Sequence, residues 1–266
     1  MLKHCVLVQA LAHMTAKEKP FTFVDTHAGA GSYSLGSDFA RKNSEFETGI
    51  ARLWERHDLP AALGEYLAQV RAVNRDGKLR FYPGSPQIAL QMIRPQDRLH
   101  FFELHPTESE VLRAYFPASD RRITVRAGDG FALLKSVLPP PSRRGLALID
   151  PSYEDKADYG KVVDTMRDAL ARFATGIYAV WYPVVRRGES QHLSDELQQL
   201  TSGDWLHVSL RVAAPPADGF GLYGSGMFVF NPHWKLEAAM REAMPVLAGT
   251  LGQHGHGAFK LQFRQT

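Results

Sequence analysis

The residues best suited to chemistry are Asp150, Pro151 and Tyr153, which follow the apolar run 146–149. A run without a polar face is typical of a strand buried on both sides in a parallel sheet, and proline ends the strand. The three residues are therefore expected in a loop at the carboxyl end of a central strand, where open α/β sheets bind their ligands. An Asp-Pro turn beside a core tyrosine is the simpler alternative.

Such a loop could activate the exocyclic amine of a nucleobase. The lone pair of that amine is delocalised into the ring, so two acceptors on its N–H groups would make the nitrogen more nucleophilic. The Asp150 carboxylate and the Pro151 carbonyl are the expected acceptors, and the Tyr153 ring offers a face for an extruded base. The sequence Asp-Pro-Ser-Tyr resembles motif IV of the amino-methyltransferases that use S-adenosylmethionine, usually Asp-Pro-Pro-Tyr, from which Ser152 departs.

A second candidate site lies near the start of the chain. The predicted strand 21–24 is followed by Asp25 and then by Gly29 and Gly31, which is typical of a first βα turn around a nucleotide. The dinucleotide fingerprint is incomplete because Ser34 occupies its third glycine position, and no P-loop sequence follows. An acid directly before the turn favours S-adenosylmethionine, whose methionine end it would face.

Two further acids follow predicted strands. Glu103 lies at the end of strand 98–104, where an acid accepts hydrogen bonds from ribose hydroxyls, and Asp129 follows strand 123–125, where it could meet the adenine amino group. Any one of these acids could be a surface group. Four in order along one sheet edge instead predict a cofactor groove from Asp25 to Asp129 and a reaction site at Asp150.

The composition is that of a globular protein, and it excludes several classes. With 266 residues, 44% hydrophobic and 22% charged, the chain suits one large α/β domain, residues 1–266. Cys5 is the only cysteine, which excludes a disulfide framework and argues against cytosine carbon methylation, a reaction that needs a Pro-Cys nucleophile. We expect a cytoplasmic protein without a membrane segment or a metal ion. The net charge of +3 is compatible with nucleic acid.

The hydrophobic periodicity predicts the elements that position these residues. Alternating strands and helices are interrupted between residues 36 and 94, where amphipathic helices and basic residues predict a helical insertion. The expected helices are 2–14, 46–54, 63–70, 87–93, 108–115, 132–137, 159–172, 192–200 and 235–247. The expected strands are 21–24, 98–104, 123–125, 146–149, 177–183, 206–212 and 227–232, with 258–263 as a short closing strand.

Over essentially its whole length the chain resembles the RlmJ family of 23S ribosomal RNA adenine-N6 methyltransferases. The resemblance is carried by the segments LKHC, FVDTHAGAGSYSLG, FYPGSP, FELHP, AGDGF, SRRGLALIDPSYE, FATGIYAVWYPVV, GSGMFVFNP and HWKLE. It implies a Rossmann-like class I methyltransferase fold with a mostly parallel, seven-stranded sheet and an inserted helical subdomain. It also implies that Asp150 is catalytic and that Lys3 lies near the substrate. The residues implied to contact S-adenosylmethionine are His4, His27, Ser85, Glu103, Asp129 and Gly130.

The resemblance makes 23S ribosomal RNA the expected partner of a monomeric enzyme. Members of the family usually carry a further segment before Leu-Lys-His, with a tyrosine that contacts the RNA, whereas this chain begins at Met1-Leu2-Lys3. Two alternatives stay open: a DNA adenine-N6 methyltransferase, which shares the core motifs, and a non-catalytic nucleic-acid-binding protein that acts in DNA uptake or use. A dehydrogenase is disfavoured by Ser34 and by Asp150-Pro151.

Overall fold

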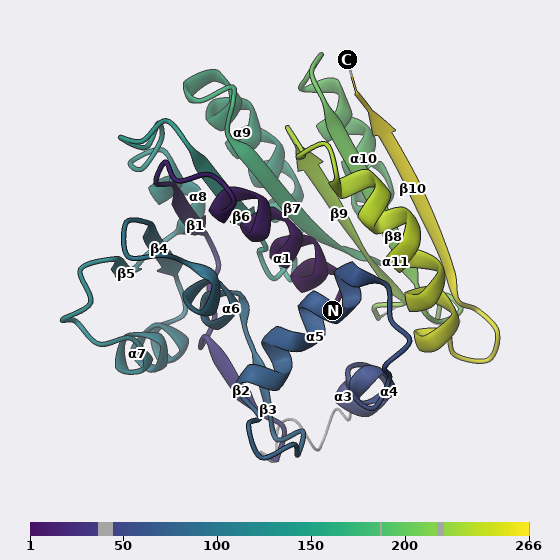
Figure 1. Ribbon diagram of the computed structural model, residues 1–266. Helices are drawn as coiled ribbons and strands as arrows, with labels where there is room; N and C mark the ends of the chain where they lie inside the picture. Colours follow the sequence, from purple (N-terminus) through teal and green to yellow (C-terminus); the bar gives the residue numbers. More distant parts are fainter. Residues whose placement is uncertain (37–44, 187, 217–220, 266) are drawn as a thin grey trace.

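A large mixed sheet forms the centre of the molecule. The structure is a computed structural model that describes residues 1–36, 45–186, 188–216 and 221–265. Within these ranges eight strands form one sheet in the order β10-β8-β9-β7-β6-β1-β4-β5, and a second sheet pairs β2 with β3 (Figure 1).

Five strands of the large sheet run parallel to one another. In spatial order they are β5 (Ile123–Ala127), β4 (Arg98–Glu103), β1 (Thr22–Asp25), β6 (Gly145–Ile149) and β7 (Ile177–Val184). Every residue of β1 and β6 is buried. This explains why the run 146–149 has no polar face: helices cover the sheet on both sides.

The other half of the sheet is antiparallel. Strand β9 (Gly224–Phe230) lies between β7 and β8 (Trp205–Arg211), and β10 (Ala258–Arg264) forms the edge beside β8. Among the described residues the sheet thus has eight strands where seven were predicted, because the expected closing strand pairs fully with β8.

Two layers of helices bury the sheet. One apolar cluster joins the sheet to α1 (Leu2–Thr15), α6 (Ser85–Met92), α7 (Pro106–Tyr115) and α11 (Leu236–Leu251). A second cluster on the opposite face joins it to α8 (Gly130–Leu134), α9 (Ala157–Arg172) and α10 (Gly188–Gln199). Helix α1 is buried on most of its surface because α5 (Ala61–Ala72) packs on its outer side (Figure 1).

The chain leaves the βα alternation directly after the glycine turn. Strand β2 (Ser32–Ser34) pairs antiparallel with β3 (Phe81–Pro83), so the two ends of the intervening stretch lie side by side. Between them lie α3 (Glu45–Thr48), α4 (Ala51–Trp54) and α5. The single helix predicted over 46–54 is instead two short helices, which meet at Gly49 and Ile50. Residues 37–44 of the predicted insertion lie outside the described residues.

Candidate active site

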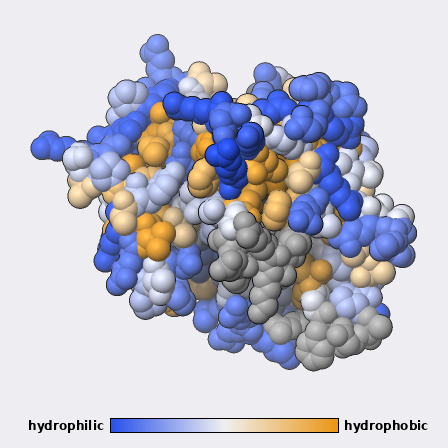
Figure 2. Space-filling model, turned by 90° about the horizontal axis from the view of Figure 1, so that it is seen from below, coloured by the Kyte–Doolittle hydropathy of each residue, from blue (hydrophilic) through white to orange (hydrophobic). Residues whose placement is uncertain are grey.

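The acids predicted to share one sheet edge do share it. Because β5, β4, β1 and β6 are parallel neighbours, their carboxyl ends present Asp129, Glu103, Asp25 and Asp150 in that order. Adjacent strands are about 4.8 Å apart, so the four acids follow one another along this edge, where the sequence predicted the cofactor groove. The parallel strands run downward in Figure 1, so Figure 2 views the molecule from the side of this edge and shows patches of apolar side chains between hydrophilic ones.

Asp150 forms an ion pair with Lys3. The Lys3 ammonium donates to Oδ2 of Asp150, and the two side chains are only 22% and 13% exposed. Burial raises the pKa of Asp150, and Lys3 acts against that shift. Burial alone would lower the pKa of Lys3, but the attraction to Asp150 outweighs it and the pKa is raised. The Lys3 ammonium thus favours the ionised form of the Asp150 carboxyl, which burial disfavours.

Asp25 is fully buried at the end of β1 and only partly satisfied. Its Oδ1 accepts a hydrogen bond from the His27 amide at 3.3 Å, whereas its Oδ2 has no hydrogen-bond partner among the described residues. Burial raises the pKa of Asp25 to about 6, although a hydrogen bond with the Ser85 side chain and the charge of Lys3 oppose the shift. A buried carboxylate oxygen without a partner suits a cationic group of a ligand.

His4 lies on the first turn of α1, next to Lys3. Its Nδ1 lies 2.9 Å from the Tyr82 hydroxyl, which is in turn 2.9 Å from the hydroxyl of Tyr66. Its Nε2 is buried without a partner among the described residues. Burial, followed by the charge of Lys3, lowers the pKa of His4 well below its usual value, so the ring is neutral. It offers a second unsatisfied polar atom to a ligand.

The glycine turn is hydrogen-bonded to Glu103. The Gly29 amide donates to Oε2 of Glu103 at 2.8 Å, and the His105 amide donates to Oε1 at 2.7 Å. Gly29 and Gly31 have φ values of +61° and +86°, which disfavour residues with a side chain. The Gly31 carbonyl accepts from the Gly84 amide, which places Ser85 and the start of α6 against the turn.

Asp129, Gly130 and His27 lie together at the far end of the groove. Oδ1 of Asp129 accepts from the Phe131 amide and caps α8, and a Cβ on Gly130 would collide with the Thr26 carbonyl. The Thr26 hydroxyl donates to the Leu148 carbonyl, so Nδ1 of His27, 2.8 Å from that hydroxyl, is the donor there and Nε2 is left as an acceptor. Burial lowers the pKa of His27 to about 4.

Pro151 and Tyr153 continue the loop after Asp150, and both are buried. Tyr153 is 3% exposed, has a φ of +55°, and donates from its hydroxyl to the Trp181 carbonyl at 2.7 Å. Its ring centroid lies 4.6 Å from that of Tyr159. The ring belongs to the apolar cluster under α9, so a stacking role for Tyr153 stays a prediction.

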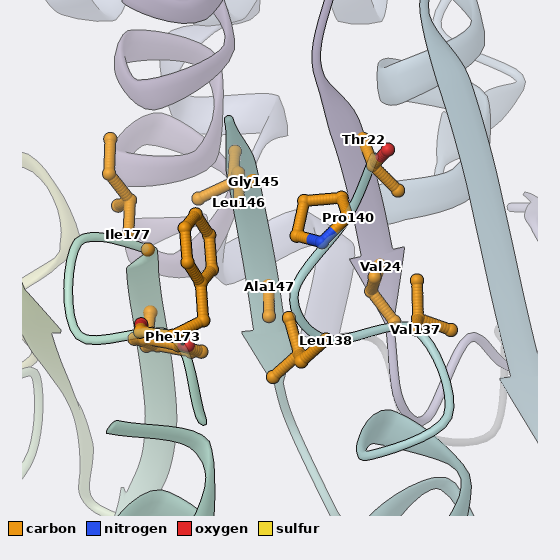
Figure 3. Close-up of a pocket in the computed structure, with 12 residues that line it drawn as sticks. Thr22, Val24, Val137, Leu138, Pro140, Gly145, Leu146, Ala147, Phe173 and Ile177 are labelled. Carbon is orange, nitrogen blue, oxygen red and sulfur yellow. Dashed lines mark hydrogen bonds between the residues drawn. The ribbon is translucent and has the colours of Figure 1, made fainter. Parts of the chain in front are cut away.

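A separate hollow lies at the opposite end of the same strands. Residues at the starts of β1, β6 and β7 line it, together with Leu138 and Pro140 (Figure 3). Its lining is apolar except for Thr22 and Tyr178. It therefore lacks the acids of the carboxyl edge and is a gap in packing.

The described residues contain neither a candidate metal site nor a candidate membrane span. Across the described ranges no three His, Cys, Asp or Glu side chains form a group that could hold a metal ion. In the same ranges no helix is both long and apolar enough to cross a bilayer.

Some residues of this site were not predicted from the sequence. Tyr82 and Tyr66 orient His4, Thr26 orients His27, and a Cβ at Gly29 would collide with the Tyr33 hydroxyl. Tyr33 and Tyr82 face each other across the β2–β3 pairing. Strands of three residues have too little hydrophobic alternation to be recognised in a sequence, so this pairing gave no signal.

The groove fits S-adenosylmethionine on the evidence of these residues. Oδ2 of Asp25 and Nε2 of His4 are buried polar atoms without partners in the described part of the chain, and Asp25 directly precedes the turn that holds Gly29 and Gly31. The sheet order and this groove define the class, a Rossmann-like methyltransferase with S-adenosylmethionine as methyl donor.

Known proteins identify the family. The family model described as "Ribosomal RNA large subunit methyltransferase D, RlmJ" matches residues 18–265. The protein named ribosomal RNA large subunit methyltransferase J in Escherichia coli K12 is 47% identical over 257 residues, which cover 97% of this chain and 91% of the relative. The protein of the same name in Haemophilus influenzae is 42% identical over 264 residues, 99% and 93% of the two chains.

A solved structure agrees with this identification. A crystal structure of a Legionella pneumophila protein superposes with a TM-score of 0.89 at 32% identity, covering 98% of this chain and 95% of the other. The chain belongs to the RlmJ family of ribosomal RNA large subunit methyltransferases, as its sequence motifs predicted.

Proposed function

We propose that the protein transfers a methyl group to N6 of an adenine in 23S ribosomal RNA, with Asp150 as the catalytic residue. The observation that carries the proposal is the position of Asp150. It follows β6, directly beside β1, whose end carries Asp25 and the glycine turn. A base extruded toward Asp150 would therefore meet a methyl donor bound along the neighbouring strands.

Asp150 and Pro151 would act on the target amine. S-adenosylmethionine supplies an electrophilic methyl group on a positively charged sulfur. The adenine amine would give one N–H to the Asp150 carboxylate and the other to the Pro151 carbonyl, which raises the electron density on N6. Positive charge would grow on N6 as it takes the methyl group and the thioether leaves, and the Asp150 carboxylate would stabilise that charge until the surplus N6 proton is released to solvent.

Lys3 would prepare Asp150 for this role. Its ion pair would favour the ionised form of the buried carboxylate before a base arrives. The incoming amine then takes the place of the Lys3 ammonium on Oδ2. Tyr153 would support the extruded base with its ring, from the buried position that it holds beside Tyr159.

The groove residues divide by the part of the cofactor that they would hold. Asp25 and Ser85 suit the methionine end, because the Ser85 side chain hydrogen-bonds the buried Asp25 carboxylate. His4, next to Lys3, would add the Nε2 atom that has no partner among the described residues. Glu103 suits the ribose hydroxyls. His27, Asp129 and Gly130 suit the adenine, because they lie together at the start of α8.

The stretch 36–94 would act on the RNA as a helical insertion within a single domain, residues 1–266. Its turn after α5 carries the exposed cations Arg75, Lys78 and Arg80, which suit phosphate groups.

One experiment tests the proposal. The protein is incubated with labelled S-adenosylmethionine and either deproteinised 23S ribosomal RNA or DNA, and the nucleosides are separated by mass spectrometry. We expect N6-methyladenosine in the RNA alone. Methylation of DNA alone would make the protein a DNA methyltransferase, and binding without methyl transfer to either substrate would make it a binding protein.

A further inference from the structure

An aromatic hollow adjoins the active-site edge and is not used by the reaction described above. It lies where the β2–β3 pair meets the ends of α5 and α7, and it is lined by Ser32, Tyr33, Ser34, Val73, Phe81 and Tyr115. The Tyr33 hydroxyl lies over Gly29, and the charges of Lys3 and Asp25 act on the pKa of Tyr33, which burial raises. The hollow is thus continuous with the rim of the groove.

Three aromatic rings in this hollow face solvent. Tyr33, Phe81 and Tyr115 are 43%, 45% and 42% exposed. The Tyr115 hydroxyl donates to Oε1 of Gln87 at 2.6 Å, which fixes that ring as a wall. Phe81 has only carbon atoms to offer a ligand. Exposed rings gathered in one hollow provide flat apolar faces, and every nucleobase has a face that can stack on them.

A rigid turn with basic residues leads into the hollow. Asn74 is buried, and its amide group donates to the carbonyls of Val70 and Phe81 while its Oδ1 accepts from the amides of Arg80 and Phe81. These four bonds hold the turn 74–80 against the start of β3. Arg75, Lys78 and Arg80 are all exposed on it. Asp76 pairs with Arg80 at 2.9 Å, which leaves the turn with an excess of positive charge.

Aromatic faces beside a fixed basic turn match the two parts of a nucleotide. A protein partner would be expected to cover the rings with apolar side chains, whereas the cations at the mouth favour a polyanion. An unpaired nucleotide uses both features, since its base stacks while its phosphate meets the cations. Lys3, which pairs with Asp150, also acts on the pKa of Tyr33 in the hollow, so one RNA strand would reach both places.

We propose that the aromatic hollow is a subsite for an unpaired base next to the target adenine, stacked on Phe81, with its phosphate against Arg75 and Lys78. The inference rests on the proposed function and deepens it. The subsite would orient the RNA strand so that extrusion delivers the target base to Asp150. The recognition is by stacking and charge, so it tolerates any base at that position.

Phe81→Ala tests the stacking, and Phe259→Ala is the matched control. Phe259 is 43% exposed on β10, at the far edge of the large sheet (Figure 1). The RNA is a fragment of 23S ribosomal RNA that the parent protein methylates, with 2-aminopurine placed in turn at each neighbour of the target adenine. Affinity is followed by fluorescence, and the affinity for S-adenosylmethionine is measured separately by calorimetry.

We expect the parent protein to quench 2-aminopurine at one neighbouring position and Phe81→Ala to abolish the quenching. Affinity for the RNA should fall about 5- to 100-fold in Phe81→Ala, stay unchanged in Phe259→Ala, and be largely restored in Phe81→Trp. The affinity for S-adenosylmethionine should not change. In Arg75→Gln/Lys78→Gln, RNA affinity should depend less steeply on salt.

Two results would overturn the inference. Equal RNA affinity for Phe81→Ala and Phe259→Ala would show that the exposed rings take no part in binding. Weaker binding of S-adenosylmethionine by Phe81→Ala would make the hollow a part of the cofactor groove. Both results are binding measurements that do not depend on methyl transfer. They are therefore distinct from a failure of the parent protein to methylate RNA, which would contradict the proposed function itself.

Discussion

The Lys3 ammonium pairs with the Asp150 carboxylate, although 147 positions separate the two residues in the chain. Helix α1 brings them together, because its buried side packs on β6 and β9 and sets its first turn against the carboxyl end of β6. The first helix therefore contributes to the edge that carries Asp150. Lys3 favours the ionised form of Asp150, and under the proposed function it would compete with the target amine for Oδ2.

Replacing Asp150 by Asn should slow methyl transfer without weakening cofactor binding. The substitution keeps the size of the side chain but puts a donor where the amine needs an acceptor. Loss of such a contact costs roughly 3 kcal/mol, on the order of a hundredfold in rate. Single-turnover methylation of the RNA fragment measures the effect, with Asp164→Asn as a control, since Asp164 is 76% exposed and pairs only with Arg167 among the contacts of described residues. A rate near that of the parent protein would refute the mechanism.

Lys3→Met should shift the pH dependence of methylation. Lys3 lowers the pKa of Asp150 against the effect of burial. Without the lysine the carboxyl pKa rises further, so the carboxylate forms only at higher pH. The acidic limb of the single-turnover pH–rate profile should move to higher pH. At pH values above the shifted limb, Lys3→Met should recover part of the parent methylation rate. Arg167→Met, which removes an exposed cation from the pair with Asp164, should leave the limb in place. An unmoved limb in Lys3→Met would mean that Lys3 has no influence on Asp150.

The sequence predicted the acids of the groove because each one follows a strand with a clear pattern. Parallel strands bring their carboxyl ends to one edge, so order along the chain was enough to place Asp25, Glu103, Asp129 and Asp150 there. The β2–β3 pair could not be predicted in this way. It joins residues 47 or more positions apart through two strands of three residues, and only the tertiary fold brings them together.

The surroundings of Tyr153 also depend on tertiary packing. The place of Tyr153 in the Asp-Pro-Ser-Tyr motif predicted a ring with a face open to an extruded base. In the structure Tyr153 has a positive φ, and its ring is buried beside Tyr159 and Trp181. Tyr159 lies on α9 and Trp181 on β7, and the sequence around Tyr153 does not predict either contact. Spacing thus predicted which residue occupies the loop, and packing decided which way its side chain points.

Removing the Glu103 carboxylate should weaken binding of S-adenosylmethionine for two reasons. Glu103 is expected to accept from the ribose hydroxyls, and it holds the glycine turn through the Gly29 amide. In Glu103→Gln the lost charge-assisted bonds should reduce affinity about 10- to 100-fold, and Glu103→Ala should reduce it at least as much. Calorimetry without RNA is the measurement. Glu110→Ala, at an exposed position of α7, is the control. Unchanged affinity in both Glu103 variants would remove Glu103 from the cofactor site.

Binding of S-adenosylmethionine should strengthen as the pH rises through about 6. Burial raises the pKa of Asp25 to about 6, and only the ionised carboxylate attracts the ammonium group of the ligand. His27, with a pKa of about 4, stays neutral above pH 5, and burial lowers the pKa of His4 well below its usual value. Calorimetry between pH 5 and 7 should therefore show up to tenfold tighter binding per pH unit below the midpoint. Asp25→Asn should bind weakly and show little dependence on pH.

The same buried carboxyl should make Asp25→Asn more stable than the parent protein at neutral pH. A carboxyl pKa raised from 3.8 to about 6 means that the folded state disfavours the charge. The neutral Asp25 carboxyl makes its full contribution to the free energy of unfolding below pH 3.8. As the pH rises through 6 this contribution is lost, which lowers the free energy of unfolding by about 3 kcal/mol. Without cofactor, Asp25→Asn should therefore melt at a higher temperature than the parent at pH 7.5, and the difference should shrink toward pH 4.5. A variant that melts lower at pH 7.5 would show that Asp25 is stabilised by contacts within the protein and is not held in place for a ligand.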